Sequence, residues 1–88
     1  MEGHSHISPE VLVRYAADAA AEVRGVHTKQ RRGARIAGNE IEVHVVIDYG
    51  ASIPEVAAEI QQRVGDYLAR MADMRPSSVD VVVDDVMR

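Results

Sequence analysis

The sequence contains no cysteine, no tryptophan and no phenylalanine, and three tyrosines are its only aromatic residues. The absence of cysteine excludes disulfide bonds, thiolate metal sites and a cysteine nucleophile. No apolar run approaches the roughly 20 residues of a membrane-spanning helix, and the first residues lack the basic start and apolar core of a signal peptide. These absences are compatible with a cytoplasmic protein.

Cationic charge is also scarce, because the formal net charge is −4 at pH 7. An acidic balance of this kind does not favour bulk attraction to nucleic acid or to anionic lipid. A chain of 88 residues forms one domain. We expect a flexible N-terminal tail over residues 1–7 and a single domain over residues 8–88.

The clearest pattern is a strand followed by a long helix, over residues 41–71. The strand alternates apolar and polar positions, and the helix repeats its apolar residues at the 3.6-residue period of one face. Ser52 and Glu55 fit a capping box at the start of the helix, and Pro54 occupies the first turn, where no backbone donor is needed.

The flanking segments supply a second helix and two more strands. Ser8, Pro9 and Glu10 predict the start of a helix that continues to Arg24. Residues 26–37 predict a strand that turns at residues 38–39 and pairs with the next strand. The turn places Ile36 opposite Ile41 and Arg35 opposite Glu42. It also points Gln30 and Arg32 inward. An edge strand tolerates this conflict if the two residues lie beyond the helices, or a bulge at Gly33 shifts the register. Residues 79–85 predict the last strand.

The order helix-strand-strand-helix-strand predicts an α+β fold with a three-stranded mixed sheet. The second and third strands should be parallel, because a strand-helix-strand crossover joins them. Each helix has one apolar face, and only one side of the sheet offers apolar partners. We therefore expect both helices on one face and an uncovered face opposite.

Several residues could carry chemistry, but none forms a convincing site. His4 and His6 lie in the tail. His27 and His44 could meet across the hairpin near Asp48, yet solvated surface histidines are the simpler interpretation. Asp84 and Asp85 are adjacent, so strand alternation would send them to opposite faces. The sequence predicts no catalytic residue, no cofactor and no metal site.

A basic stretch runs from Arg24 to Arg35, with five basic residues and no acidic residue between Val23 and Asn39. Such a stretch could bind phosphate or an acidic partner, which makes a small nucleic-acid-binding domain the alternative function. It contains no aromatic residue that could stack on a base. A strand edge protected from aggregation by charge also explains it, and we prefer that interpretation.

The uncovered face of the sheet is the candidate interaction surface. On the predicted register, charge changes from basic on the first strand to acidic on the third, with two valines between them. Such a surface is complementary to a two-fold copy of itself. The residues that we assign to it are Lys29, Arg31, Arg35, Glu42, His44, Val46 and Val82.

The chain resembles the alkaline shock protein domain family, the bacterial envelope and general stress proteins that include the Gls type. The matching segments cover roughly residues 7–86, and their order and spacing carry the resemblance. They are Ile7-Ser8-Pro9-Glu10-Val11, Glu22-Val23-Arg24-Gly25-Val26, Val45-Val46-Ile47-Asp48-Tyr49-Gly50, Ile53-Pro54-Glu55-Val56-Ala57, Ile60-Gln61-Gln62-Arg63-Val64 and Val79-Asp80-Val81-Val82-Val83. Position 73, often glycine in similar sequences, is Asp73 here.

The resemblance implies a non-enzymatic interaction module of the envelope or general stress response. Similar proteins are cytosolic, often associate with the inner face of the membrane through a separate anchor protein, and in several cases self-associate. The family has no catalytic residues to carry over. The expected partner is therefore a protein, either a second copy or a membrane-anchor protein, with nucleic acid as the alternative.

Overall fold

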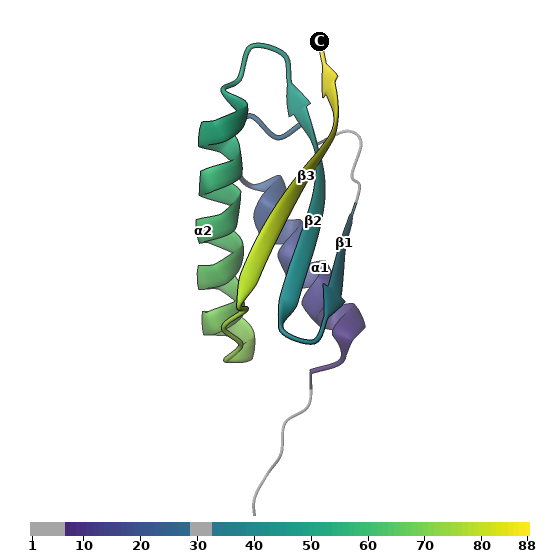
Figure 1. Ribbon diagram of the computed structural model, residues 1–88, viewed down its shortest axis with the longest axis vertical. Helices are drawn as coiled ribbons and strands as arrows, with labels where there is room; N and C mark the ends of the chain where they lie inside the picture. The colour runs from purple at the N-terminus through teal and green to yellow at the C-terminus, as the bar shows by residue number, and fades with distance from the viewer. Residues whose placement is uncertain (1–6, 29–32) are drawn as a thin grey trace, which may run out of the picture.

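The computed structural model describes residues 7–28 and 33–88. Two helices lie on one side of a three-stranded mixed sheet (Figure 1), which confirms the predicted fold class. The sheet order is β1-β2-β3, with β1 antiparallel and β3 parallel to β2. The elements in chain order are α1 (Pro9–Ala21), β1 (Gly33–Ala37), β2 (Glu40–Asp48), α2 (Ile53–Ala72) and β3 (Ser78–Met87).

Helix α1 begins where its capping sequence predicts and ends earlier than expected. The Ser8 hydroxyl accepts a hydrogen bond from the Val11 amide (3.4 Å). The helix stops at Ala21 rather than at Arg24, and the chain then turns through Gly25 at φ +102°. A Cβ atom on Gly25 would lie 2.8 Å from Cγ2 of Val56. The helix therefore ends where the backbone must pass closely over α2, which only glycine permits.

The β1–β2 hairpin has the predicted register, with Ile36 opposite Ile41. The predicted first strand over residues 26–37 is wrong in its extent, because β1 begins only at Gly33. Upstream, Val26 makes an isolated antiparallel bridge with Ile47. The bridge and the hairpin differ in register by four residues, because Val26 pairs with Ile47 whereas Gly33 pairs with His44. Residues 29–32 lie outside the described residues, so the bulge at Gly33 and the inward positions of Gln30 and Arg32 stay predictions.

The α2 helix joins two parallel strands and carries caps at both ends. The Ser52 hydroxyl accepts from the Glu55 amide (3.4 Å), as the capping pattern predicts. At the other end, Asp73 adopts the left-handed conformation (φ 50°, ψ 37°), and the Leu68 carbonyl accepts from the Met74 amide. Strand β3 extends beyond the predicted residues 79–85, and its pairing with β2 shifts by one residue between Val45 and Val46.

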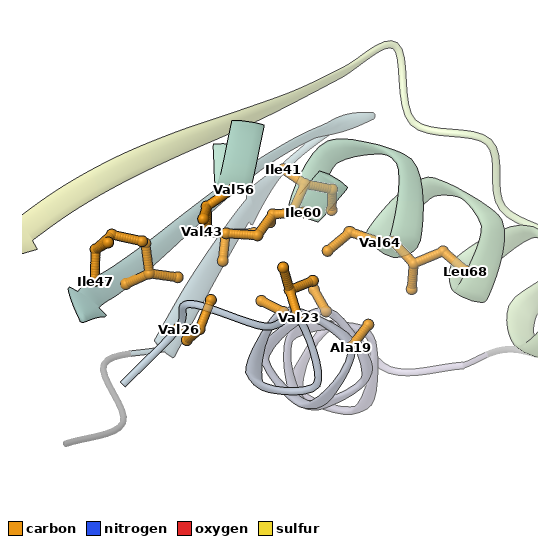
Figure 2. Packing of buried hydrophobic residues seen from close by; sticks show 13 residues of the cluster. Ala19, Val23, Val26, Ile41, Val43, Ile47, Val56, Ile60, Val64 and Leu68 are labelled. Atoms are coloured by element: carbon orange, nitrogen blue, oxygen red, sulfur yellow. The ribbon is translucent and has the colours of Figure 1, made fainter. Parts of the chain in front are cut away.

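The core lies between the sheet and the two helices (Figure 2). The inward side of β2 contributes a continuous apolar row, α2 contributes every third or fourth residue, and α1 contributes alanines that let the helix approach closely. The buried residues of this cluster are Ala16, Ala19, Ala20, Val23, Val26, Ile41, Val43, Val45, Ile47, Val56, Ile60, Val64 and Leu68. Among the residues that the structure describes, no polar or charged side chain is buried.

The two helices also contact each other on their outer side. The rings of Tyr15 and Tyr67 pack edge to face, with centroids 5.6 Å apart. Arg63 pairs with Glu59 on α2 (3.3 Å) and approaches Glu22 just beyond α1 (3.9 Å). An edge-to-face aromatic pair contributes about 1 kcal/mol beyond its buried area. These contacts hold the helices as one layer, and no helix of the described residues covers the opposite face of the sheet (Figure 1).

Candidate interaction surface

A chain of polar contacts crosses the uncovered face of the sheet from strand to strand. Arg35 on β1 pairs with Glu42 on β2 (3.4 Å), as the predicted cross-strand pair requires. Glu42 Oε2 also contacts His44 Nε2. The other ring nitrogen of His44 contacts both carboxylate oxygens of Asp84 on β3 (3.1 and 3.2 Å). We call these four residues the open-face network, because one histidine links carboxylates from two strands.

The network shifts the pKa values of its two central members in opposite directions. The hydrogen bond to Glu42, followed by that to Asp84, raises the pKa of His44 above its ordinary value of 6.5. The hydrogen bond from His44, with smaller contributions from Arg35, lowers the pKa of Glu42 below 4.5. Both shifts have the same cause: each group is stabilised in its charged form by an oppositely charged neighbour.

Val82 and Val46 occupy different environments, although the sequence predicts both as exposed. Val82 lies opposite His44 and is partly buried, so it remains available on the surface. Val46 is 0% exposed, so its predicted exposure is wrong. The Gly25–His27 segment bonds to β2 on one side of Val46, through the His27 amide and the Val46 carbonyl (2.7 Å). The irregular part of β3 lies on its other side, where Val46 pairs with Asp85.

The remaining predicted surface residues divide between the described and the undescribed parts of the chain. Arg35, Glu42 and His44 come together as the open-face network. Lys29 and Arg31 lie outside the described residues, so the predicted change from basic to acidic charge is described only from Arg35 onward.

The two histidines that could have met across the hairpin are engaged separately. His27 Nδ1 contacts Asp48 Oδ1 (2.9 Å), whereas His44 bonds to Glu42 and Asp84. Within residues 7–28 and 33–88, no group of three or more histidine or acidic side chains is arranged to hold a metal ion. His4 and His6 lie outside these ranges.

The prediction that Asp84 and Asp85 point to opposite faces is wrong. The register shift inserts Asp84 as an extra residue, so that Val45 pairs with Val83 and Val46 pairs with Asp85. Asp84 reaches His44 on the open face. Asp85 pairs with Val46, which alternation places on the same side of β2 as His44. A β-bulge interrupts side-chain alternation in this way. The consecutive aspartates after an alternating run were the only signal of it in the sequence.

Comparison with known proteins identifies the family. The model of the alkaline shock protein 23 family, described as having a cell envelope-related function, matches residues 34–88, more than half of the chain. The chain belongs to this family. The match begins one residue into β1 and covers the rest of the strand-strand-helix-strand unit, which includes every member of the open-face network. It confirms the resemblance inferred from the sequence.

A curated protein and several solved structures are also similar to this chain. The chain is 27% identical over 99 residues to an uncharacterized protein of Bacillus subtilis (strain 168), YqhY, covering 90% of this chain and 73% of that one. Two solved structures of MamM-CTD variants are each 25% identical with a TM-score of 0.50. They cover 86% of this chain and 95% and 93% of theirs. These structures have a similar α+β fold.

Within residues 7–28 and 33–88, neither helix combines the length and the apolar character needed to cross a bilayer. The longer of the two, α2, carries a charged outer face that includes Glu59 and Arg63.

Proposed function

We propose that this member of the alkaline shock protein family is a non-enzymatic interaction module. It binds a protein partner through the uncovered face of its sheet: a membrane-anchor protein at the cell envelope or a second copy. The envelope-related description of the family supports the setting. The partner's identity is inferred from the resemblance, and the surface is inferred from the structure.

The open-face network is the observation that carries this proposal. It fixes charged groups in place across three strands, with the partly buried Val82 between them. The side chains of Glu42, His44 and Asp84 are each about one-third exposed, at 33%, 31% and 30%. Preorganised, partly exposed charges beside a small apolar residue suit recognition of a protein surface, because little side-chain entropy remains to be lost on binding.

The same geometry argues against catalysis. Both nitrogens of His44 are engaged by carboxylates, so the ring offers no lone pair as a general base while it is protonated. Ser52 caps α2 and has no histidine partner in the described residues. An interaction role uses the charges as they stand, whereas an enzyme would need a nucleophile or base that this face does not present.

A tagged pull-down from native cells, with and without nuclease and read by mass spectrometry, tests the proposal. We expect the native chain to recover a small membrane protein or its own untagged copy, regardless of nuclease. Val82→Asp, which adds a carboxylate beside Asp84, should reduce recovery at least about tenfold. Gln62→Asp places the same charge on the outer side of α2 and is the matched control.

Two results would contradict the proposal. Equal recovery by the native chain and Val82→Asp, with both shown to be folded by circular dichroism, would remove the open face from consideration. Loss of the recovered material on nuclease treatment would favour nucleic-acid binding through the basic stretch that ends at Arg35. Steep weakening of the recovered complex with salt would add to that conclusion, because phosphate contacts release counterions.

A further inference from the structure

Among the described strands, the outer edge of β3 has no neighbouring strand in the sheet. The directions of its backbone amide and carbonyl groups follow from the hydrogen bonds that β2 makes to its two neighbours. The Val46 carbonyl and the Asp48 amide bond to the Gly25–His27 segment, on the β1 side of β2. The odd-numbered residues of β2 therefore bond to β3, because backbone groups alternate along a strand. Parallel pairing then sends the backbone groups of Asp80 and Val82 toward β2. Those of Val79, Val81 and Val83 point outward.

Near each end of this outer edge, a side chain hydrogen-bonds to an outward backbone group. The Gln61 side-chain amide on α2 donates to the Val79 carbonyl (3.0 Å). Beyond the bulge the alternation reverses, since the Met87 carbonyl accepts from the Tyr49 amide on the β2 side (2.7 Å). Val86 therefore points outward, and its amide donates to the Asp85 carboxylate (2.8 Å). Between these two points, no side chain in the described part of the chain hydrogen-bonds to the outward backbone groups of Val81 and Val83.

The side chains around this opening differ between its two sides. Val79, Val81 and Val83 face the helices, pack against the core and are only partly buried. On the other side, Asp80 and Asp84 are exposed, with Asp85 following them. A strand added here would place one set of its side chains next to valines and the alternate set next to carboxylates.

Extending the proposed function, we propose that the β3 edge at Val81 and Val83 binds an extended segment of a partner protein. In that segment apolar residues alternate with lysine or arginine. The backbone bonds of β-strand addition supply affinity, the valine side selects apolar residues, and the carboxylate side selects cations. The side-chain hydrogen bonds from Gln61 to the Val79 carbonyl and from the Val86 amide to Asp85 limit the contact to a short stretch around Val81 and Val83.

A second copy using its own β3 is a poorer occupant. Antiparallel pairing of two β3 strands about Val82 would place Asp80 of one copy opposite Asp84 of the other, at both ends of the contact. Like charges directly opposite each other destabilise a strand pair. The bulge after Val83 also twists the strand, which disfavours continuation into a second sheet. A short segment needs only the opening itself.

The first experiment titrates the full chain with a fluorescein-labelled peptide in which valine alternates with lysine, followed by anisotropy and amide hydrogen exchange. We expect saturable binding and slower exchange at the Val81 and Val83 amides. The same peptide methylated at alternate backbone nitrogens, and a peptide in which valine alternates with glutamate, should each bind at least about tenfold more weakly. Protection at β1, or equal binding by the methylated peptide, would overturn the proposal.

Variants separate this site from the open face. Val81→Pro removes an outward amide, a change that edge strands tolerate, and should weaken peptide binding at least about tenfold. Asp80→Lys should do the same by reversing charge, and Asp66→Lys on α2 is the matched control.

Doubling of mass by sedimentation without peptide, abolished by Val81→Pro, would overturn the proposal in favour of a second copy. Failure of the peptide while Val82→Asp still loses the cellular partner would overturn this inference alone. Intact peptide binding with no effect of Val82→Asp on the pull-down would overturn the proposed face alone.

Discussion

The two faces of the sheet are held by different physical forces. The helix-covered face of β2 is an unbroken apolar row, in which Ile41, Val43 and Ile47 are each 1% exposed. The uncovered face is held by charges paired across strands, with Arg35, Glu42, His44 and Asp84 in one network. The covered face depends on the removal of apolar area from water and is insensitive to pH. The open face depends on protonation.

This difference also separates stability from recognition. Burial of apolar side chains is the dominant stabilising contribution in a domain of this size. Partly exposed ion pairs contribute on the order of 0–1 kcal/mol each. The covered face therefore determines whether the chain folds, and the open face can vary its charges at little cost to folding. Variants on the two faces should consequently behave very differently.

The sharpest test introduces the same carboxylate at two valines of the sheet. Val46→Asp should destabilise the domain by more than about 4 kcal/mol, because an unpaired charge would be buried. Val82→Asp should cost about 1 kcal/mol or less, because Val82 is only partly buried. Urea denaturation measures both. Equal losses would mean that Val46 and Val82 share one environment, against the enclosure of Val46.

Gly25 and Gly38 allow a test of the covered side against the open hairpin turn. Gly25→Ala should cost about 2–4 kcal/mol, because it combines a positive φ with a Cβ 2.8 Å from Val56. Gly38→Ala, at φ +60° with no atom within 4 Å of its Cβ, should cost about 1 kcal/mol. The difference between the two losses of stability measures the cost of the contact between the added Cβ atom and Val56. A difference near zero would show that Val56 moves aside freely.

The open face should add a pH dependence that the covered face lacks. The raised pKa of His44 contributes stability that is fully present below its unfolded value, near 6.5, and is lost as pH rises through the folded pKa. The lowered pKa of Glu42 contributes stability that is present above 4.5 and is lost as pH falls through the folded pKa.

His44→Gln isolates the histidine part of this dependence. Between pH 6 and pH 9, Tm of the native chain should fall by about 3 °C more than Tm of the variant, as measured by scanning calorimetry. Parallel curves for the two proteins would show that the His44 contacts with Glu42 and Asp84 are not maintained in solution.

The smallest expected effect lies at the end of α2, away from both faces. Asp73 holds a left-handed conformation that glycine adopts without strain. Asp73→Gly should therefore stabilise the domain by about 0.5–1 kcal/mol, despite loss of the exposed ion pair with Arg75. Asp73→Ala, which removes the same ion pair and keeps a Cβ, is the control. Destabilisation by Asp73→Gly would mean that the ion pair with Arg75 contributes more stability than the relief of backbone strain.

Much of the fold could be predicted because local patterns agreed with one another. The caps at Ser8 and Ser52, the alternation of β2 and the turn at residues 38–39 each act over a few neighbouring residues. The register that pairs Arg35 with Glu42 follows directly from that turn. Crossover handedness then gives the parallel pairing of β2 and β3.

The errors arose where distant segments determine the outcome. Val26 pairs with Ile47 rather than continuing the hairpin, because α1 ends early and Gly25 brings the chain close to Val56. The bulge at Asp84 depends on how β3 fits against β2 over its whole length. Neither feature leaves a periodic signal, so the enclosure of Val46 and the contact between His44 and Asp84 could not be predicted in detail.

The order of the helices and strands, the apolar side of each and the family resemblance follow from the sequence, because caps, turns and hydrophobic periods are local physical preferences. Which valine is buried, which carboxylates contact His44 and which backbone groups of β3 remain unpaired depend on tertiary structure. Those outcomes depend on the relative position of segments far apart in the chain. There a one-residue shift in pairing changes which groups meet.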